Sequence, residues 1–195
     1  MPPARNTTRA VVLGASWGGL DAITGVLRML PEVFPLPVLV VQHQRSGSGD
    51  RFAEVLRPRI TLPVVSPEDR DPVQPGTVCV APPGYHMLVD ETERVCFSMG
   101  PLVHYCRPAI DELFFSAGYV YGAGLIGVIL TGANEDGAAG LDYIRRRGGV
   151  TLIQDPAEAE AAAMPQAALD AGAGEALPLE RLGERIMEQA FGRDA

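Results

Sequence analysis

The chain has 195 residues, of which 47% are hydrophobic and 21% charged, a balance typical of a globular protein and too apolar for a disordered one. Its net charge of −8 argues against a nucleic-acid partner, because a duplex binder needs a basic face. No apolar run approaches the roughly 20 residues that span a bilayer, and residues 1–8 lack the apolar core of a secretory signal. We therefore expect a single cytoplasmic domain without membrane insertion.

A strand, a tight turn and a helix are predicted near the start of the chain. Residues 10–13 are typical of a buried strand, and apolar residues recur at helical spacing over 20–30. Between them, Ser16 is flanked by Gly14 and Gly18, and such glycines allow a cramped turn that lifts a serine hydroxyl out of the sheet. The same stretch also fits the phosphate-binding loop of a nucleotide-binding domain.

Strands and helices alternate through most of the remaining sequence. Continuous apolar runs at 37–41, 125–131 and 150–154 are typical of parallel strands covered on both faces. Three short runs at 77–81, 86–90 and 94–98 are interpreted as antiparallel hairpins added to the sheet, and helices are expected over 50–56, 109–121, 138–147, 158–171 and 180–191. The predicted fold class is α/β: a three-layer, doubly wound, mainly parallel sheet with helices on both faces and an added antiparallel hairpin.

Three polar side chains directly follow predicted parallel strands. Ser16 follows the first strand, His43 the second, and Asp136 the apolar strand at 125–131. Because the carboxyl ends of parallel strands meet at one edge of a sheet, we expect the three side chains to converge there. Histidine can accept the proton of a serine hydroxyl near pH 7, and a carboxylate can orient and stabilise the resulting imidazolium. The three residues are therefore candidates for a catalytic triad.

Each of these residues also has a simpler structural role open to it. Ser16 can be ordinary turn chemistry, and His43 can be a hydrogen-bonded structural residue. Asp136 can cap the helix that begins at Gly137. The convergence of all three on one edge favours the catalytic interpretation.

The remaining histidines and the cysteines carry weaker signals. His86 falls in a hairpin and His104 in an irregular segment, so both are rival bases of lower rank. The three histidines are far apart, which gives no support for a metal site. Cys79 and Cys96 lie in apolar runs and are expected to be buried free thiols, and Cys106 lacks the small-residue turn that a nucleophile needs.

The chain order of the candidate residues excludes an ordinary α/β-hydrolase. That class has the order serine, acid, histidine. The one aspartate between Ser16 and His43 is Asp21, which lies in the predicted helix and at no strand end.

A wider set of motifs resembles the catalytic domain of the chemotaxis receptor methylesterases (CheB type). The resemblance covers about residues 9–190, as a single domain with flexible termini at 1–8 and 191–195. It rests on Gly14-Ala15-Ser16-Trp17-Gly18-Gly19, Val41-Gln42-His43, Val80-Ala81-Pro82-Pro83-Gly84-Tyr85-His86, Arg107-Pro108-Ala109-Ile110-Asp111-Glu112-Leu113-Phe114, Ile129-Leu130-Thr131-Gly132, Asp136-Gly137-Ala138-Ala139-Gly140, Gln154-Asp155-Pro156 and Met164-Pro165.

The resemblance implies a function and a set of site residues. The family hydrolyses γ-glutamyl methyl esters on the cytoplasmic domains of methyl-accepting chemoreceptors, and many members also deamidate glutamines there. Ser16, His43 and Asp136 match its catalytic triad. No metal or organic cofactor is required. We expect oxyanion or substrate-binding groups at Trp17 and at Gly132 and Ala133.

The chain also departs from the usual family pattern. Ala133 replaces a methionine beside the active site, Glu135 adds a second carboxylate next to the candidate aspartate, and Trp17 stands where threonine is common. Most members carry an N-terminal receiver domain, and none is expected here, because the first catalytic strand begins at residue 10.

Three alternatives to a chemoreceptor methylesterase follow from the sequence. One is a catalytically weak or silent module of the same fold that acts as a binding partner in a signalling array. Another is a related serine hydrolase or deamidase acting on a different acyl substrate. A nucleotide-binding domain is the third, but the chain lacks the third glycine of G-x-G-x-x-G and a Walker lysine.

Overall fold

The structure is a computed structural model that describes residues 8–44, 47 and 49–192. The flexible ends expected at 1–8 and 191–195 lie largely outside these residues. Within them, the last helix, α6 (Leu179–Phe191), continues to Phe191.

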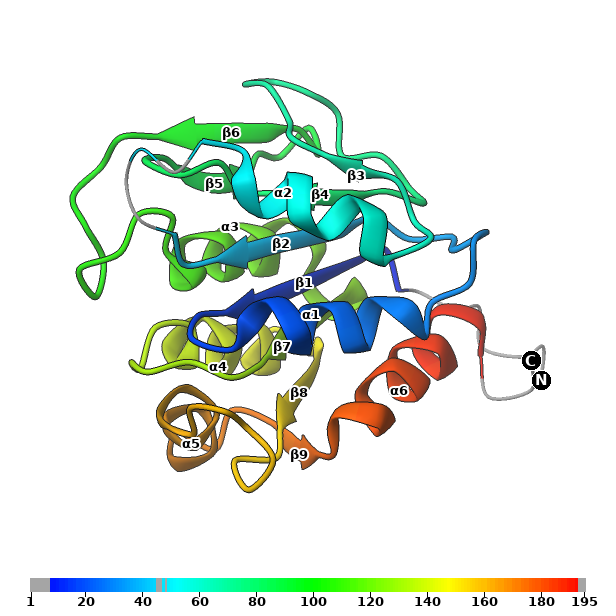
Figure 1. Cartoon of the computed structure of the whole chain (residues 1–195), viewed down its shortest axis with the longest axis vertical. Helices are drawn as coiled ribbons and strands as arrows, with labels where there is room; N and C mark the ends of the chain where they lie inside the picture. Colours follow the sequence, from blue (N-terminus) through cyan, green and yellow to red (C-terminus); the bar gives the residue numbers. More distant parts are fainter. Residues whose placement is uncertain (1–7, 45–46, 48, 193–195) are drawn as a thin grey trace.

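A seven-stranded parallel sheet forms the centre of the molecule (Figure 1). Its inner strands are almost entirely buried, as expected for apolar runs covered on both faces. In spatial order the strands are β3 (Val64–Val65), β4 (Val78–Val80), β2 (Val38–Gln42), β1 (Ala10–Ala15), β7 (Leu125–Ile129), β8 (Val150–Gln154) and β9 (Glu175–Leu177). Strand β1 therefore lies between β2 and β7, and all three end at the same edge.

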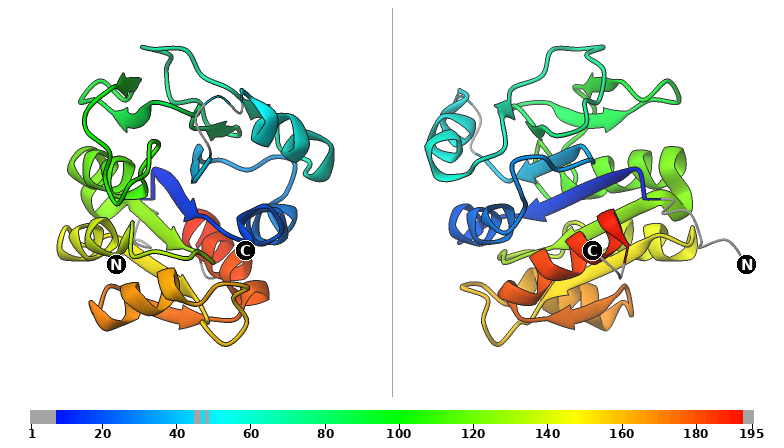
Figure 2. Two further views of the ribbon diagram at one scale, coloured as in Figure 1. Left: turned by 60° about the vertical axis from the view of Figure 1, so that its left-hand side comes forward. Right: turned by 90° about the vertical axis from the view of Figure 1, so that its right-hand side faces the viewer.

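Helices cover both faces of this sheet (Figure 2). One face packs against α1 (Gly19–Arg28), α2 (Arg51–Leu56) and α6, and the other against α3 (Ile110–Tyr121), α4 (Ala138–Arg146) and α5 (Ala163–Asp170). Val11 and Leu13 point to the first core and Val12 to the second, which is the alternation expected of a strand. Short 3₁₀ turns, η1 (Arg57–Arg59) and η2 (Gly122–Gly124), follow α2 and α3. In the described part of the chain no helix is long and apolar enough to cross a bilayer.

The fold class predicted from the sequence is confirmed, but one predicted hairpin strand is wrong. Val78–Val80 is not part of a hairpin; it is β4, which pairs in parallel with β2 and β3 in the main sheet. Its side chains alternate between the two cores, which a three-residue run does not reveal. Strands β5 (His86–Val89) and β6 (Val95–Ser98) do form an antiparallel hairpin, but as a separate two-stranded sheet in the α3 core.

The alanine-rich helix also begins later than predicted. It was expected over 158–171, whereas α5 begins at Ala163. The residues before it are tied instead to the loop that follows β7: the Ala161 N–H donates to Thr131 Oγ1 at 2.8 Å, and the Gly132 N–H donates to the Ala161 carbonyl at 3.0 Å. These contacts place the start of α5 beside the loop that carries Asp136.

Candidate active site

Ser16 and His43 leave the sheet side by side. They follow Ala15 and Gln42, which are paired in the parallel register of β1 and β2. The His43 N–H donates to the Ala15 carbonyl at 3.0 Å, which carries the pairing one residue beyond β2. Both residues thus lie at the carboxyl edge of the sheet, as expected from their positions after predicted strands.

The turn that presents Ser16 depends on two glycines. Gly18 has a φ of 75°, in the left-handed region that disfavours side chains. At Gly19 a Cβ would lie 2.8 Å from the Ala15 Cβ and 1.9 Å from Oε1 of Gln42, so a larger residue would displace the Gln42 side chain. The Gln42 amide in turn donates to the Ser16 carbonyl at 2.7 Å and to the His43 carbonyl at 3.1 Å. Gln42, which motif reasoning gave no role, therefore fixes the backbones of both residues.

Asp136 holds one nitrogen of the His43 ring. Its Oδ2 lies 2.7 Å from His43 Nε2, and the carboxylate is fully buried. The same carboxylate accepts the N–H groups of Ile110 at 2.7 Å and Asp111 at 3.0 Å, at the start of α3. Asp136 therefore caps α3 and not α4, where Gly137 has no side-chain cap. The simpler role considered for it, as a cap of its own helix, is wrong.

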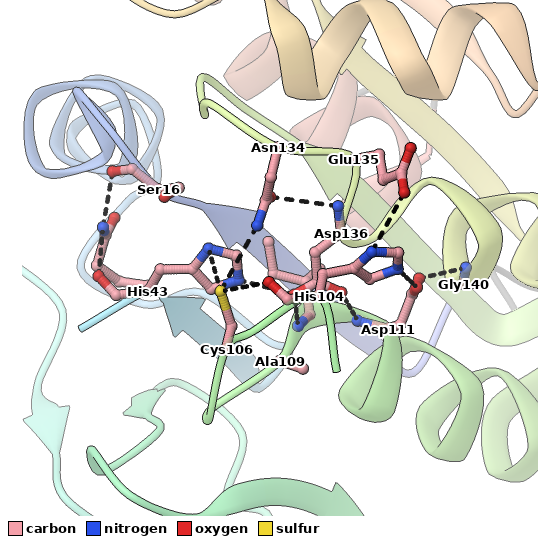
Figure 3. Close-up of polar contacts among 12 residues, drawn as sticks. Ser16, His43, His104, Cys106, Ala109, Asp111, Asn134, Glu135, Asp136 and Gly140 are labelled. Atoms are coloured by element: carbon pink, nitrogen blue, oxygen red, sulfur yellow. Dashed lines mark hydrogen bonds and ion pairs between the residues drawn. The ribbon is translucent and has the colours of Figure 1, made fainter. Parts of the chain in front are cut away.

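The other ring nitrogen, Nδ1, faces a thiol. Cys106 Sγ lies 3.4 Å from His43 Nδ1 and 3.5 Å from Asn134 Nδ2. Ser16 lies on the side of the ring opposite Asp136 (Figure 3), so Nδ1 is also the nitrogen available to it. Among the described residues, no hydrogen bond joins the Ser16 hydroxyl to this ring. The spacing of residues in the sequence did not predict that Cys106 lies beside His43.

The environment of His43 changes its acidity. Burial lowers the pKa of the imidazole, but the hydrogen bonds to Asp136 and Cys106, together with their negative charge, outweigh it and raise the pKa from 6.5 to about 9. The imidazolium form is therefore favoured at neutral pH, and the ring becomes a free base only on the alkaline side.

The candidate oxyanion groups lie where the turn after Ser16 meets the loop after β7. Ser16 N–H donates to the Thr131 carbonyl at 2.9 Å, and Thr131 Oγ1 donates to the Trp17 carbonyl at 2.9 Å. The Gly132 N–H is already bonded to Ala161. In the described structure the N–H groups of Trp17 and Ala133 have no such partner, which leaves them available to a ligand.

The rival bases take other roles. His86 is buried, with Nδ1 accepting the Ala109 N–H at 3.2 Å and Nε2 at 2.9 Å from the Pro101 carbonyl, so both nitrogens serve the fold. His104 Nε2 lies 3.4 Å from Asp111 Oδ2, and His104 Nδ1 lies 3.4 Å from Glu135 Oε1, so this ring pairs with two carboxylates.

One group of side chains near the site has metal-ligating atoms. Donor atoms of His104, Asp111 and Asp136 lie within 4.8 Å of one another. The carboxylates are already engaged: Asp136 accepts two backbone N–H groups besides the His43 ring, and Asp111 Oδ1 accepts the Gly140 N–H at 2.7 Å. These bonds use the lone pairs that a cation would need, so the donor set fits helix capping better than metal binding.

A cavity of about 370 Å³ opens beside this group. Its walls come from the segment before α3, the loop before α4, and α5; they are His104, Tyr105, Asn134, Glu135, Ala163 and Ala167. Trp17, on the other loop, is 66% exposed and Tyr105 is 95% exposed. The site thus has an open rim with two aromatic side chains.

A doubly wound sheet with serine, histidine and aspartate at three adjacent strand ends defines a protein of the serine hydrolase class. Comparison with known proteins identifies the family within this class. The family model described as CheB methylesterase matches residues 11–186, and the chain belongs to this family. The resemblance found in the sequence motifs is thereby confirmed.

Individual relatives agree with this assignment. The chain is 41% identical to a Leptospira interrogans protein whose name provisionally assigns it protein-glutamate methylesterase and protein-glutamine glutaminase activity; the match covers 90% of this chain and 91% of that protein. It is 42% identical to the protein-glutamate methylesterase FrzG of Myxococcus xanthus, over 91% of this chain but only 54% of that protein. The crystal structure of the Thermotoga maritima CheB methylesterase catalytic domain superposes with a TM-score of 0.87 and 30% identity, covering 93% of this chain and 98% of that one.

Proposed function

We propose that this chain is a cytoplasmic protein-glutamate methylesterase, which removes methyl groups from γ-methyl esters of glutamate on the cytoplasmic domains of methyl-accepting chemoreceptors. The observation that carries the proposal is the placement of Ser16, His43 and buried Asp136 at three adjacent strand ends, with His43 Nε2 held at 2.7 Å by Asp136. Membership of the CheB methylesterase family supplies the substrate class.

In the proposed mechanism, His43 Nδ1 accepts the Ser16 proton as the hydroxyl attacks the ester carbonyl. Asp136 keeps Nε2 protonated and stabilises the imidazolium. The imidazolium then gives its proton to the leaving methoxide, methanol departs, and a glutamyl ester of Ser16 remains. Water, activated by His43, hydrolyses this ester and restores the serine.

The backbone N–H groups of Trp17 and Ala133 are the donors we propose for the tetrahedral oxyanion. A donor of this kind contributes about 3–4 kcal/mol to transition-state stabilisation. Ala133 would act through its backbone, so the absence of a methionine side chain at this position leaves the donor intact. A glutamine side chain presents the same carbonyl, with ammonia as leaving group in place of methanol, so the site also suits deamidation.

Methanol release from a methylated chemoreceptor fragment tests the proposal. We expect release by the wild-type chain, and losses of at least about a thousandfold for Ser16→Ala and His43→Ala. Unchanged release by Ser16→Ala would refute the mechanism. A wild-type chain that binds the fragment without releasing methanol would favour a catalytically silent module, and hydrolysis of other acyl substrates alone would favour a different serine hydrolase.

A further inference from the structure

Cys106 is held against His43 by a tight backbone turn. The Val103 N–H donates to the Cys106 carbonyl at 3.2 Å, and the Cys106 N–H donates back to Val103 at 2.8 Å. Between them, His104 and Tyr105 have φ values of 48° and 63°, a left-handed conformation that is uncommon for residues other than glycine. The turn therefore fixes the backbone of Cys106, and contacts with His43 Nδ1, the His104 carbonyl and Asn134 Nδ2 hold the sulfur.

The sulfur engages the nitrogen that the reaction needs. Cys106 Sγ is 3.4 Å from His43 Nδ1, while Nε2 is bonded to Asp136. The thiol S–H has two acceptors at 3.4 Å, the Nδ1 lone pair of His43 and the His104 carbonyl, and it blocks Nδ1 when it donates to the ring. If the thiol proton has instead moved to the imidazole ring, it is bonded to Nδ1 through that same lone pair. In both cases Nδ1 cannot accept a proton from Ser16.

We propose that Cys106 is a positioning residue that holds the His43 ring in its resting orientation and competes with Ser16 for Nδ1. Nδ1 must be released from the sulfur before the serine can be deprotonated. The proposal rests on the serine hydrolase function proposed above and adds to it a restraint on nucleophile activation.

The charged surroundings of His43 agree with this role. The titratable groups that contact the ring are Asp136, from the loop before α4, and Cys106, from the turn before α3. Asp111 and Glu135 lie nearby but face His104. Burial lowers the pKa of His43, whereas Asp136 and then Cys106 raise it, to about 9. Removal of the thiol should therefore lower this pKa.

The proposal is tested by the rate at which Ser16 reacts with a fluorophosphonate. In this reaction the serine oxygen forms a bond to phosphorus, fluoride leaves, and His43 takes the serine proton, so no receptor substrate is needed. The rate is measured from pH 5 to pH 10 in the wild type, Cys106→Ala and Cys106→Ser. Cys96→Ala is the control for loss of a thiol away from the site, because Cys96 contacts Asp90. Ser16→Ala is the blank.

We expect the acid limb of the Cys106→Ala profile to shift down by about one pH unit, which makes labelling at pH 7 roughly tenfold faster. Cys106→Ser should shift in the same direction by less, because a hydroxyl at this position can still hydrogen-bond to Nδ1, and Cys96→Ala should match the wild type. Superimposable profiles, or slower labelling of both Cys106 variants at every pH, overturn the proposal. A wild type that fails to react overturns the serine hydrolase function itself, and the role of Cys106 falls with it.

A measurement on the unmodified protein guards against variants that fail to fold. Ring ¹⁵N chemical shifts of His43 report the state of Nδ1 directly. We expect Nδ1 to be protonated or hydrogen-bonded at pH 7. A free, unprotonated Nδ1 in the wild type overturns the proposal whatever the variants do.

Discussion

Asp136 caps helix α3, which contains Asp111, and Asp111 in turn caps helix α4, which follows Asp136 in the chain. Asp136, which precedes α4, accepts N–H groups of Ile110 and Asp111 at the start of α3, and Asp111 accepts the Gly140 N–H in the first turn of α4 at 2.7 Å (Figure 3). Both carboxylates are buried. The partner of the His43 ring is therefore held by the N-terminus of α3, where negative charge is favoured, and α3 is itself tied to α4 through Asp111.

This reciprocal capping predicts the effect of Asp111→Ala. The substitution leaves the Gly140 N–H uncapped, so the free energy of unfolding should fall by about 1–2 kcal/mol. Because the tie between α3 and α4 beside Asp136 is lost, kcat should also fall, by about tenfold. Urea denaturation and methanol release measure the two effects. Asp170→Ala, at the exposed end of α5, is a matched control that should change neither quantity. A loss of stability with an unchanged kcat would assign Asp111 to the fold alone.

The acidity of His43 predicts a pH dependence of stability. Its pKa is raised from 6.5 to about 9 on folding, so the stabilisation is fully present below pH 6.5 and is lost as pH rises to about 9. A shift of this size corresponds to about 3 kcal/mol. The difference in unfolding free energy between the wild type and His43→Asn should therefore shrink by about that amount from pH 6 to pH 9.5, as followed by urea denaturation. A difference that is constant across this range would contradict the prediction.

Trp17 is predicted to act on substrate binding and not on the chemical step. Its indole is 66% exposed beside the nucleophile, while its backbone N–H is the group proposed to contact the oxyanion. Trp17→Ala removes the ring and keeps the N–H. We expect KM for a methylated receptor fragment to rise about tenfold with kcat nearly unchanged, as for an aromatic contact at an interface. Fluorophosphonate labelling of Ser16 should be unaffected. An equal loss in labelling would place the indole in the catalytic step.

The strand-end positions of Ser16, His43 and Asp136 could be predicted from the sequence. Each follows an apolar run, and the parallel topology fixes the edge at which such runs end. The short edge strands β3 and β9 were missed because two or three residues carry no periodic signal, and β9 is mostly exposed. Strand β4 was assigned to a hairpin for the same reason.

The contacts around the His43 ring could not be predicted. Cys106 is 63 positions away from His43 and reaches it through an irregular turn with two left-handed residues, neither of them glycine. Asp136 was expected near the ring, but its bonds to α3 depend on how α3 packs against β1, which no local pattern encodes. Long-range packing decided both contacts.

At Gly14 the helix α3 packs directly against the backbone of β1, and this contact gives a further prediction. A Cβ at this position would lie 2.4 Å from Ile110 Cγ2, which is closer than Cβ atoms approach other heavy atoms in folded proteins. Gly14→Ala should therefore lower the unfolding free energy by about 1–3 kcal/mol through overpacking. It should also lower kcat, since Ile110 supplies one of the N–H groups that hold Asp136. Thermal unfolding and methanol release check both, with Gly100→Ala as the control because its nearest neighbour is the Ser98 hydroxyl at 3.2 Å. A Gly14→Ala variant of normal stability and rate would refute the argument.

The close approach at Gly14 also bears on how this enzyme can diversify. The strand that ends at the nucleophile and the helix that anchors the aspartate meet through the Ile110 side chain, which packs directly on Gly14, so the spacing of the reacting groups cannot be adjusted without repacking the core. New substrates must then be accommodated on the open rim, at Trp17, at Tyr105 and in the cavity beside Glu135. Efforts to redirect the specificity of this chain should randomise those positions and leave the interior as it is.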